Sequence, residues 1–189
     1  MMFDKVKKCL EEKGYTVSCF ENSSEACNYL NKEIDGVTVG HGGSMTVAEM
    51  GICELLSTHN TVYSHQTMKP GDDRAKIIFN ANNADVYLSS VNGLSEDGQI
   101  INIDGHCNRV ASTLYGHKKV YFIVGKNKLA SDYDGALYRA RNVAAPLNAK
   151  RLNRKTPCAA KGDRCYDCNS PERICRALTV LYTKPTGQE

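Results

Sequence analysis

Hydrophobic and polar residues along the chain alternate between a helical and an extended spacing. Residues 3–13 place apolar side chains at helical intervals, and Gly14 is a typical helix end. Short apolar runs follow, separated by amphipathic stretches. We expect strands at residues 15–20, 35–40, 61–64, 84–91, 99–103, 119–125 and 177–183. We expect further helices at residues 23–33, 46–56, 72–82, 132–143 and 146–152.

Strands that alternate with helices predict an α/β fold with a mostly parallel sheet flanked by helices. Ligands of such sheets bind at the carboxyl ends of the strands, which selects the loops after residues 39, 91 and 124. The composition becomes basic and rich in cysteine near residue 150. We therefore expect an α/β domain over residues 1–152, and a C-terminal segment over 153–189 that returns to this domain as a strand.

The loop at residues 40–46 (GHGGSMT) lies between a predicted strand and a predicted helix. Glycines let a backbone approach a ligand closely, and a helix N-terminus attracts anions. The candidates for binding a small carboxylate or phosphate are Gly42, Gly43, Ser44, Met45 and Thr46. The alternative is a plain turn in which Ser44 or Thr46 caps the helix. His41 is a base or an incidental surface residue, and Glu49 faces the pocket or complements the helix dipole.

A second polar segment, residues 90–109, gathers amides, carboxylates and an arginine around two Asp-Gly turns. Arg109 can clamp a carboxylate with two hydrogen bonds, and Asn92 and Asn108 can contact the substrate. Glu96 or Asp104 can act as general base or nucleophile. The alternative is a hairpin-like excursion in which Asp-Gly supplies only turn chemistry.

Four cysteines close to the C-terminus have the spacing C-x6-C-x2-C-x6-C, namely Cys158, Cys165, Cys168 and Cys175. The C-x2-C pair lets two sulfurs reach one metal, and the outer pair can complete a tetrahedral set. Four thiolates suit zinc or an iron–sulfur cluster. Structural zinc sites more often contain two C-x2-C pairs, so a single C-x2-C pair flanked by two distant cysteines favours a cluster such as [4Fe–4S]. The alternatives are two disulfides or unrelated thiols.

Charge and hydropathy narrow the class of protein. Residues 150–176 hold eight Lys or Arg residues against three acidic ones, whereas the whole chain has a net charge of +3. Positive charge beside thiols favours their ionised, metal-binding form, and the absence of interleaved aromatic residues argues against a nucleic-acid partner. No apolar run is long enough to cross a bilayer, and the N-terminus does not resemble a secretory signal. We expect a cytoplasmic protein without a membrane partner.

Several segments resemble the LUD (lactate utilisation) domain family, in a short form that carries the four-cysteine motif. They are GGSMTVAEMG (42–51), SVNGLSEDGQIINIDGHCNRVA (90–111), KKVYFIVGKNK (118–128), RNVAAPLNAKRL (141–152) and KTPCAAKGDRCYDCNSPERIC (155–175). The resemblance implies a fold similar to ribose-5-phosphate isomerase, glucosamine-6-phosphate deaminase and the CoA-transferases. SEDG (95–98) is similar to the SENG motif of class I CoA-transferases, which implies a nucleophilic Glu96, although Asp97 replaces the amide.

Two classes of function follow from the motifs and the resemblance. The first is a component of an iron–sulfur-linked L-lactate (2-hydroxy acid) oxidation system, with a small-anion pocket and iron–sulfur protein subunits as partners. If this component is catalytic, it is an oxidoreductase component acting on a 2-hydroxy acid. The alternative is a pocket enzyme of the CoA-transferase or sugar-phosphate isomerase kind with a structural metal, or a non-catalytic accessory subunit. The sequence leaves the oligomeric state open, a homo-oligomer included.

Overall fold

The computed structural model describes residues 3–189, which fold into two compact units. We refer to residues 17–90, 111–124 and 185–189 as the parallel-sheet unit. Residues 3–16, 91–110 and 125–184 form the cysteine unit, so each unit combines segments that are distant in the sequence. Neither unit begins or ends near residue 152. Among residues 3–189, no helix has the length and apolar character that spanning a membrane requires.

The parallel-sheet unit is built on four parallel strands in the order β2-β1-β3-β6. The strands are β1 (Thr38–His41), β2 (Thr61–Ser64), β3 (Val86–Ser89) and β6 (Lys119–Phe122). All four side chains of β3 are buried, as the apolar run in the sequence predicts. The predicted α/β class, with a parallel sheet flanked by helices, is confirmed in this unit.

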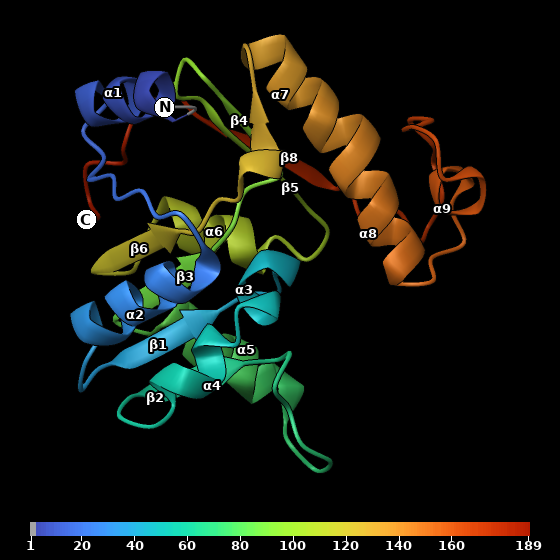
Figure 1. The fold of residues 1–189 in the computed structure, drawn as a ribbon. Helices are drawn as coiled ribbons and strands as arrows, with labels where there is room; N and C mark the ends of the chain where they lie inside the picture. The colour runs from blue at the N-terminus through green and yellow to red at the C-terminus, as the bar shows by residue number, and fades with distance from the viewer. Residues whose placement is uncertain (1–2) are drawn as a thin grey trace. The chain divides into compact units, whose positions relative to one another are not determined.

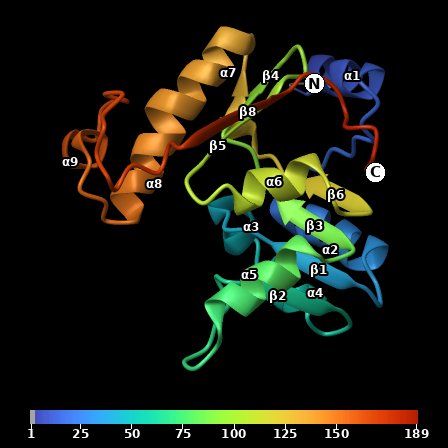
Figure 2. The ribbon, with the colours of Figure 1, turned by 180° about the vertical axis from the view of Figure 1, so that it is seen from behind.

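Helices cover both faces of this sheet (Figures 1 and 2). They are α2 (Ser23–Glu33), α3 (Met45–Glu49), α4 (Ile52–Leu56), α5 (Arg74–Asn82) and α6 (Asn108–Leu114), whose first residues belong to the cysteine unit. The core joins Leu30 of α2 and Leu56 of α4 to Val39 and Leu88 of the sheet. The backbone of α5 packs on the opposite face, beside Gly40.

Two expectations for this part of the chain are wrong. The helix expected over residues 46–56 is two short helices, because Gly51 adopts a left-handed conformation (φ 65°) between α3 and α4. Residues 15–18 alternate between half-buried and exposed positions, as a strand does, but residues 15–20 form no strand. A strand forms only when its backbone is hydrogen-bonded to a neighbouring strand. This segment passes from one unit to the other and pairs with no strand among residues 3–189.

The cysteine unit contains a second sheet with the order β7-β4-β5-β8. Its strands are β4 (Gly93–Ser95), β5 (Ile100–Asp104), β7 (Leu129–Ala130) and β8 (Ala177–Leu181). β5 pairs antiparallel with both β4 and β8, as Figure 2 shows for β8. The expected strands at 99–103 and 177–183 exist, but they do not extend the parallel sheet, because residues 93–104 form a hairpin.

A long helical run packs on this second sheet (Figure 1). It joins α7 (Tyr133–Arg139) and α8 (Ala145–Arg151) through a π-helical turn, η2 (Ala140–Ala144). Pro146 lacks a backbone N–H, and the wider turn directly before it accommodates this loss without ending the run. The remaining elements are α1 (Asp4–Glu12), the 3-10 turn η1 (Lys126–Lys128) and α9 (Pro157–Lys161).

Candidate functional site

The four cysteines predicted as metal ligands line one small cavity in the cysteine unit. Cys158, Cys165, Cys168 and Cys175 share this lining with residues of η2, α8 and the C-terminal segment. Each thiol is half-buried, and none forms a disulfide. The segment is held beside α8, which places α9 next to that helix (Figure 1). The structure therefore brings together all four residues of the motif.

Hydrogen bonds to sulfur orient three of the four thiols. The backbone N–H of Asp167 donates to Cys165 Sγ at 3.4 Å, within the C-x2-C turn. Thr156 Oγ1 lies 3.3 Å from Cys158 Sγ, and the Thr156 side chain is buried. Arg173 donates from a terminal nitrogen to Cys175 Sγ at 3.4 Å. Two N–H groups, from Asp167 and Arg173, therefore point at cysteine sulfurs, as donors around metal-bound cysteines do.

Two arginines and an aspartate surround the thiols with charge. Arg141 and Arg173 line the cavity, and Asp167 Oδ1 lies 3.8 Å and 3.6 Å from their terminal nitrogens. The hydrogen bond to Cys175 is the main reason why the pKa of Arg173 lies above its ordinary value. The two positive arginines and the negative Asp167 together leave one net positive charge beside the four thiols.

The space between the thiols is narrow. Its volume of about 10 Å³ has room for roughly one water-sized group. Among residues 3–189, no three His, Cys, Asp or Glu side chains are already arranged as a set of metal ligands. Binding of a metal ion therefore requires the thiol side chains to turn toward a common centre, and binding of a cluster also requires the cavity to widen.

The amide and arginine residues of the second polar segment form a buried network at the end of β5. Asn102 is 1% exposed, and its Oδ1 accepts hydrogen bonds from Arg109 at 2.6 Å and from the Asn92 backbone at 3.2 Å. Arg109 also donates to Asn92 Oδ1 and to the Ile103 carbonyl. Arg139 of α7 donates to the Asn92 carbonyl. Asn102 and Arg139 are not among the candidates from the sequence. A polar asparagine between two isoleucines of a predicted strand could have indicated Asn102 as a buried polar residue with a specific partner.

Asp104 closes the same network on its other side. Its two carboxylate oxygens accept from the backbone of Gly105 at 2.7 Å and of Val110 at 3.2 Å. Arg109 Nε lies 3.7 Å from Oδ2, whereas Asn108 is half-buried at the first position of α6. In this arrangement Asp104 organises the turn between β5 and α6.

The network adjoins the cysteine segment within the same unit. The Arg176 backbone donates to the Asp104 carbonyl at 2.9 Å. A Cβ atom added to Gly105 would lie 3.0 Å from the Ile174 carbonyl, so glycine permits the close approach of the two segments. Ile174 also lines the cysteine cavity. Ile174 thus contacts the turn after β5 and also lines the cavity that holds the thiols.

Replacement of Asn102 by alanine tests the network. The change removes one of the acceptors of the Arg109 guanidinium, whose side chain is only 11% exposed and which keeps Asn92 and the Ile103 carbonyl. We expect a loss of about 1.5–3 kcal/mol in the free energy of unfolding, because a hydrogen bond to a buried charged donor is lost. Urea unfolding of the purified protein measures it. The exposed Asn169→Ala variant is the control and should stay within about 0.5 kcal/mol of the parent.

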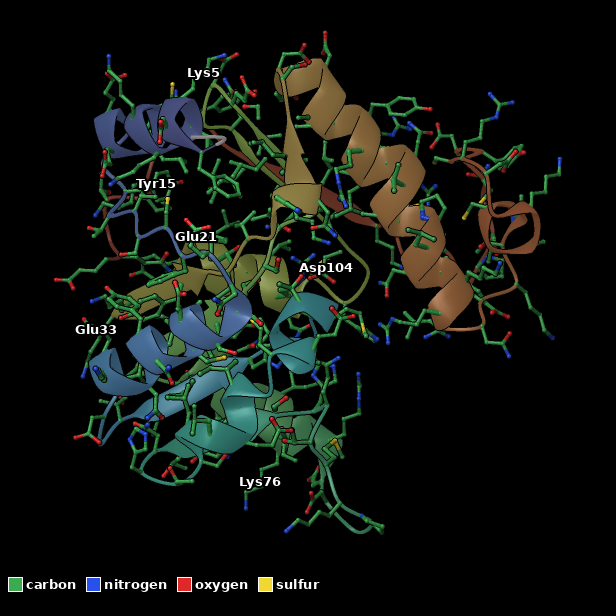
Figure 3. All side chains as sticks on the ribbon, viewed as in Figure 1. Lys5, Tyr15, Glu21, Glu33, Lys76 and Asp104 are labelled. Atoms are coloured by element: carbon green, nitrogen blue, oxygen red, sulfur yellow. The ribbon has the colours of Figure 1, made fainter. Side chains whose placement is uncertain are left out.

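Glu96 lies away from this network. It stands in the turn between β4 and β5, whereas Asn92 precedes β4, so about 13 Å of extended chain separates them. Lys5 Nζ lies 3.2 Å from both Glu96 Oε2 and Asp97 Oδ1, and these contacts raise the pKa of Lys5. Figure 3 shows Lys5 beside this turn and Asp104 at the opposite end of the hairpin. The structure does not bring Glu96 together with Asp104 and Arg109.

The glycine loop belongs to the parallel-sheet unit, where it follows β1. Ser44 caps α3: its Oγ accepts from the Val47 backbone at 3.4 Å, and its own N–H donates to Gln66. Gly42 is buried, and Gly43 adopts a positive φ of 52°. Of the two residues that the sequence offered as the helix cap, Ser44 and Thr46, the structure uses Ser44. Anion binding by this loop stays a prediction.

The neighbours of this loop differ in exposure. Met45 and Glu49 are exposed at the two ends of α3, and Thr46 is half-buried. His41 is buried, with its Nδ1 3.1 Å from Ser64 Oγ on the adjacent strand. The expectation of an incidental surface histidine is therefore wrong, because residue 41 continues β1 into the interior.

The family model described as LUD domain matches residues 3–189. A search of curated proteins finds no match. Among solved structures, a DUF162 family protein from Deinococcus radiodurans is similar, with 13% identity, a TM-score of 0.49, and coverage of 99% of this chain and 93% of that chain. Because the family match extends over nearly all of its residues, the chain belongs to the LUD domain family.

Proposed function

We propose that this LUD-domain protein is a component of an iron–sulfur-linked system that oxidises L-lactate or another 2-hydroxy acid. In this proposal Cys158, Cys165, Cys168 and Cys175 hold a [4Fe–4S] cluster. The observation that carries the proposal is that four free thiols, drawn from 18 consecutive residues, line one cavity. A set of four cysteine thiolates is the usual ligand set of such clusters.

The residues around the thiols fit a negatively charged, sulfur-rich group. The Asp167 backbone and the Arg173 side chain donate to sulfur, and the guanidinium groups of Arg141 and Arg173 supply positive charge. Solvent is limited, because each cysteine is only half-exposed. When bound, a cluster supplies one-electron transfer. The protein residues hold its ligands and set the electrostatic environment.

The carboxyl end of β5 is the proposed position of the 2-hydroxy acid. Asn108 is half-buried at this end of the strand and has a side-chain amide that can donate to a carboxylate, whereas Arg109 is held by the internal network. The Ile174 carbonyl of the cysteine segment lies against Gly105. Oxidation of a 2-hydroxy acid to the 2-oxo acid releases two electrons and two protons. An acceptor is therefore needed, and iron–sulfur protein subunits are the partners that the proposal names.

An open cleft beside the cysteines suits an acidic partner surface. The cleft has a volume of about 500 Å³, and Lys150, Arg154 and Lys155 line it. None of these three side chains forms an ion pair within residues 3–189, and Thr156 lines both the cleft and the cysteine cavity. Unpaired positive charge beside a redox group favours rapid, salt-sensitive association with an acidic surface.

The alternative of a CoA-transferase-like or isomerase-like pocket has less support. The CoA-transferase form of this alternative needs Glu96 as a nucleophile, and Lys5 is paired with its carboxylate. In addition, Glu96 and Arg109 lie at opposite ends of the hairpin. We therefore place the chemistry at the cysteine end of this unit.

Anaerobic purification of the full chain tests the proposal. We expect a brown protein with about four iron and four sulfide ions per chain, as a [4Fe–4S] cluster requires. Metal analysis, sulfide assay and the visible spectrum are the measurements. A colourless protein with about one zinc ion per chain and no sulfide would contradict the electron-transfer role, because zinc has no redox chemistry.

A further inference from the structure

One donor of a residue that lines the cysteine cavity has no acceptor within residues 3–189. The Nε atom of Arg173 is buried and makes no hydrogen bond within residues 3–189, although Arg173 lines the cavity. The same side chain uses a terminal nitrogen for Cys175 Sγ and for Asp167. A buried N–H without a partner costs about 1–3 kcal/mol, so an uncompensated donor at this place requires an explanation.

We propose that Arg173 donates a hydrogen bond from Nε to a sulfur of the cluster and thereby raises the reduction potential of that cluster. This inference rests on the proposed function. Cys175 Sγ already accepts from a terminal nitrogen of Arg173, and the other three thiols of the motif line the same cavity. An iron–sulfur cluster bound there would add bridging sulfides to these cysteine sulfurs, so it would offer Nε more sulfur acceptors than a zinc site does.

The expected direction follows from electrostatics. Reduction adds one negative charge to the cluster, and a nearby guanidinium with N–H groups aimed at sulfur stabilises the more negative state. Cys168 also lies close enough to Arg173 to interact with its charge. Arg173 is therefore a positioning residue for the cofactor, and its loss should make the cluster harder to reduce.

The experiment is a redox titration of the anaerobically purified full chain and of two variants, Arg173→Met and Arg173→Lys. We expect Arg173→Met to lower the ratio of reduced to oxidised cluster at least ten-fold at a fixed potential, which equals about 59 mV for one electron. Arg173→Lys keeps the charge but loses the Nε donor, so its shift should be smaller. Iron and sulfide contents and the electron paramagnetic resonance spectrum are measured on the same samples.

Arg176→Met is the matched control. Arg176 belongs to the same segment, but its guanidinium binds the Pro171 carbonyl at 2.7 Å and does not line the cavity. Its potential should equal that of the parent. A fully loaded Arg173→Met protein with the potential and spectrum of the parent would overturn the inference and leave the proposed function intact. A parent protein without iron and sulfide would instead overturn the proposed function.

Loss of the cluster from both Arg173 variants is also informative. If their metal-free forms unfold at the same urea concentration as the metal-free parent, the guanidinium acts on the cofactor, as proposed. If the metal-free variants are themselves destabilised while Arg176→Met is not, Arg173 has a structural role only, and the inference is wrong.

Discussion

Replacement of Cys165 and Cys168 by serine is expected to abolish cofactor binding. A serine hydroxyl is a poor ligand for iron or zinc at neutral pH, since its deprotonation is unfavourable, and two of four ligands are lost together. Iron and sulfide should fall from about four per chain to near zero. Metal analysis and the visible spectrum of anaerobically purified protein give the result.

Two other cysteines provide the control for this variant. Cys9 is half-buried on α1, and Cys19 is exposed in the parallel-sheet unit. The double variant Cys9→Ser, Cys19→Ser should keep the full complement of iron, because neither thiol lines the cavity. If the Cys165, Cys168 variant kept its iron, or if the control lost it, the four-cysteine assignment would be wrong.

The cysteine site could be predicted from sequence because its information is local. All four cysteines fall within 18 residues, and this short spacing lets them line one cavity. Arg173 lies inside the same stretch, but its contribution depends on the burial of a single nitrogen atom. No pattern in the sequence reports which of several nearby arginines has an unsatisfied donor.

The second polar segment was predicted as one site, and the structure divides it. Composition placed Glu96, Asp104 and Arg109 together because they lie close in sequence. The antiparallel register pairs Gly93 with Ile101, which sends Glu96 to the turn and Asp104 to the opposite end. Which end of a hairpin a residue occupies depends on pairing, and the three-residue strand β4 was too short to recognise beforehand.

The fold shows the same division between local and distant information. α2 (Ser23–Glu33) has the bounds expected from the sequence, and the Asn22 side chain caps it by accepting from the Glu25 backbone. β2 has the predicted bounds, Thr61–Ser64. The second sheet was not predicted, because β5 pairs with β8 across more than seventy residues and β7 has only two residues.

Gly40→Ala is expected to have the largest effect on stability. A Cβ atom at this position would lie 2.1 Å from the Ala81 carbonyl oxygen and 2.9 Å from the Tyr87 ring. Both neighbours are buried, and the carbonyl belongs to the backbone of α5, so relief requires a shift of the helix away from the sheet. We expect a loss of about 3 kcal/mol in the free energy of unfolding. For a chain of this length that equals a fall of roughly 6–12 °C in Tm.

Differential scanning calorimetry measures this change, with Gly187→Ala as the control. The nearest atom to a Cβ at Gly187 is a ring carbon of Tyr115 at 3.8 Å, so that variant should keep the Tm of the parent. A Gly40→Ala protein with an unchanged Tm would show that α5 can move freely. The result also bears on the glycine loop, because Gly40 is its first residue. A large loss of stability without any ligand present would assign this glycine to helix packing, and would leave only Gly42 and Gly43 as glycines that could serve an anion.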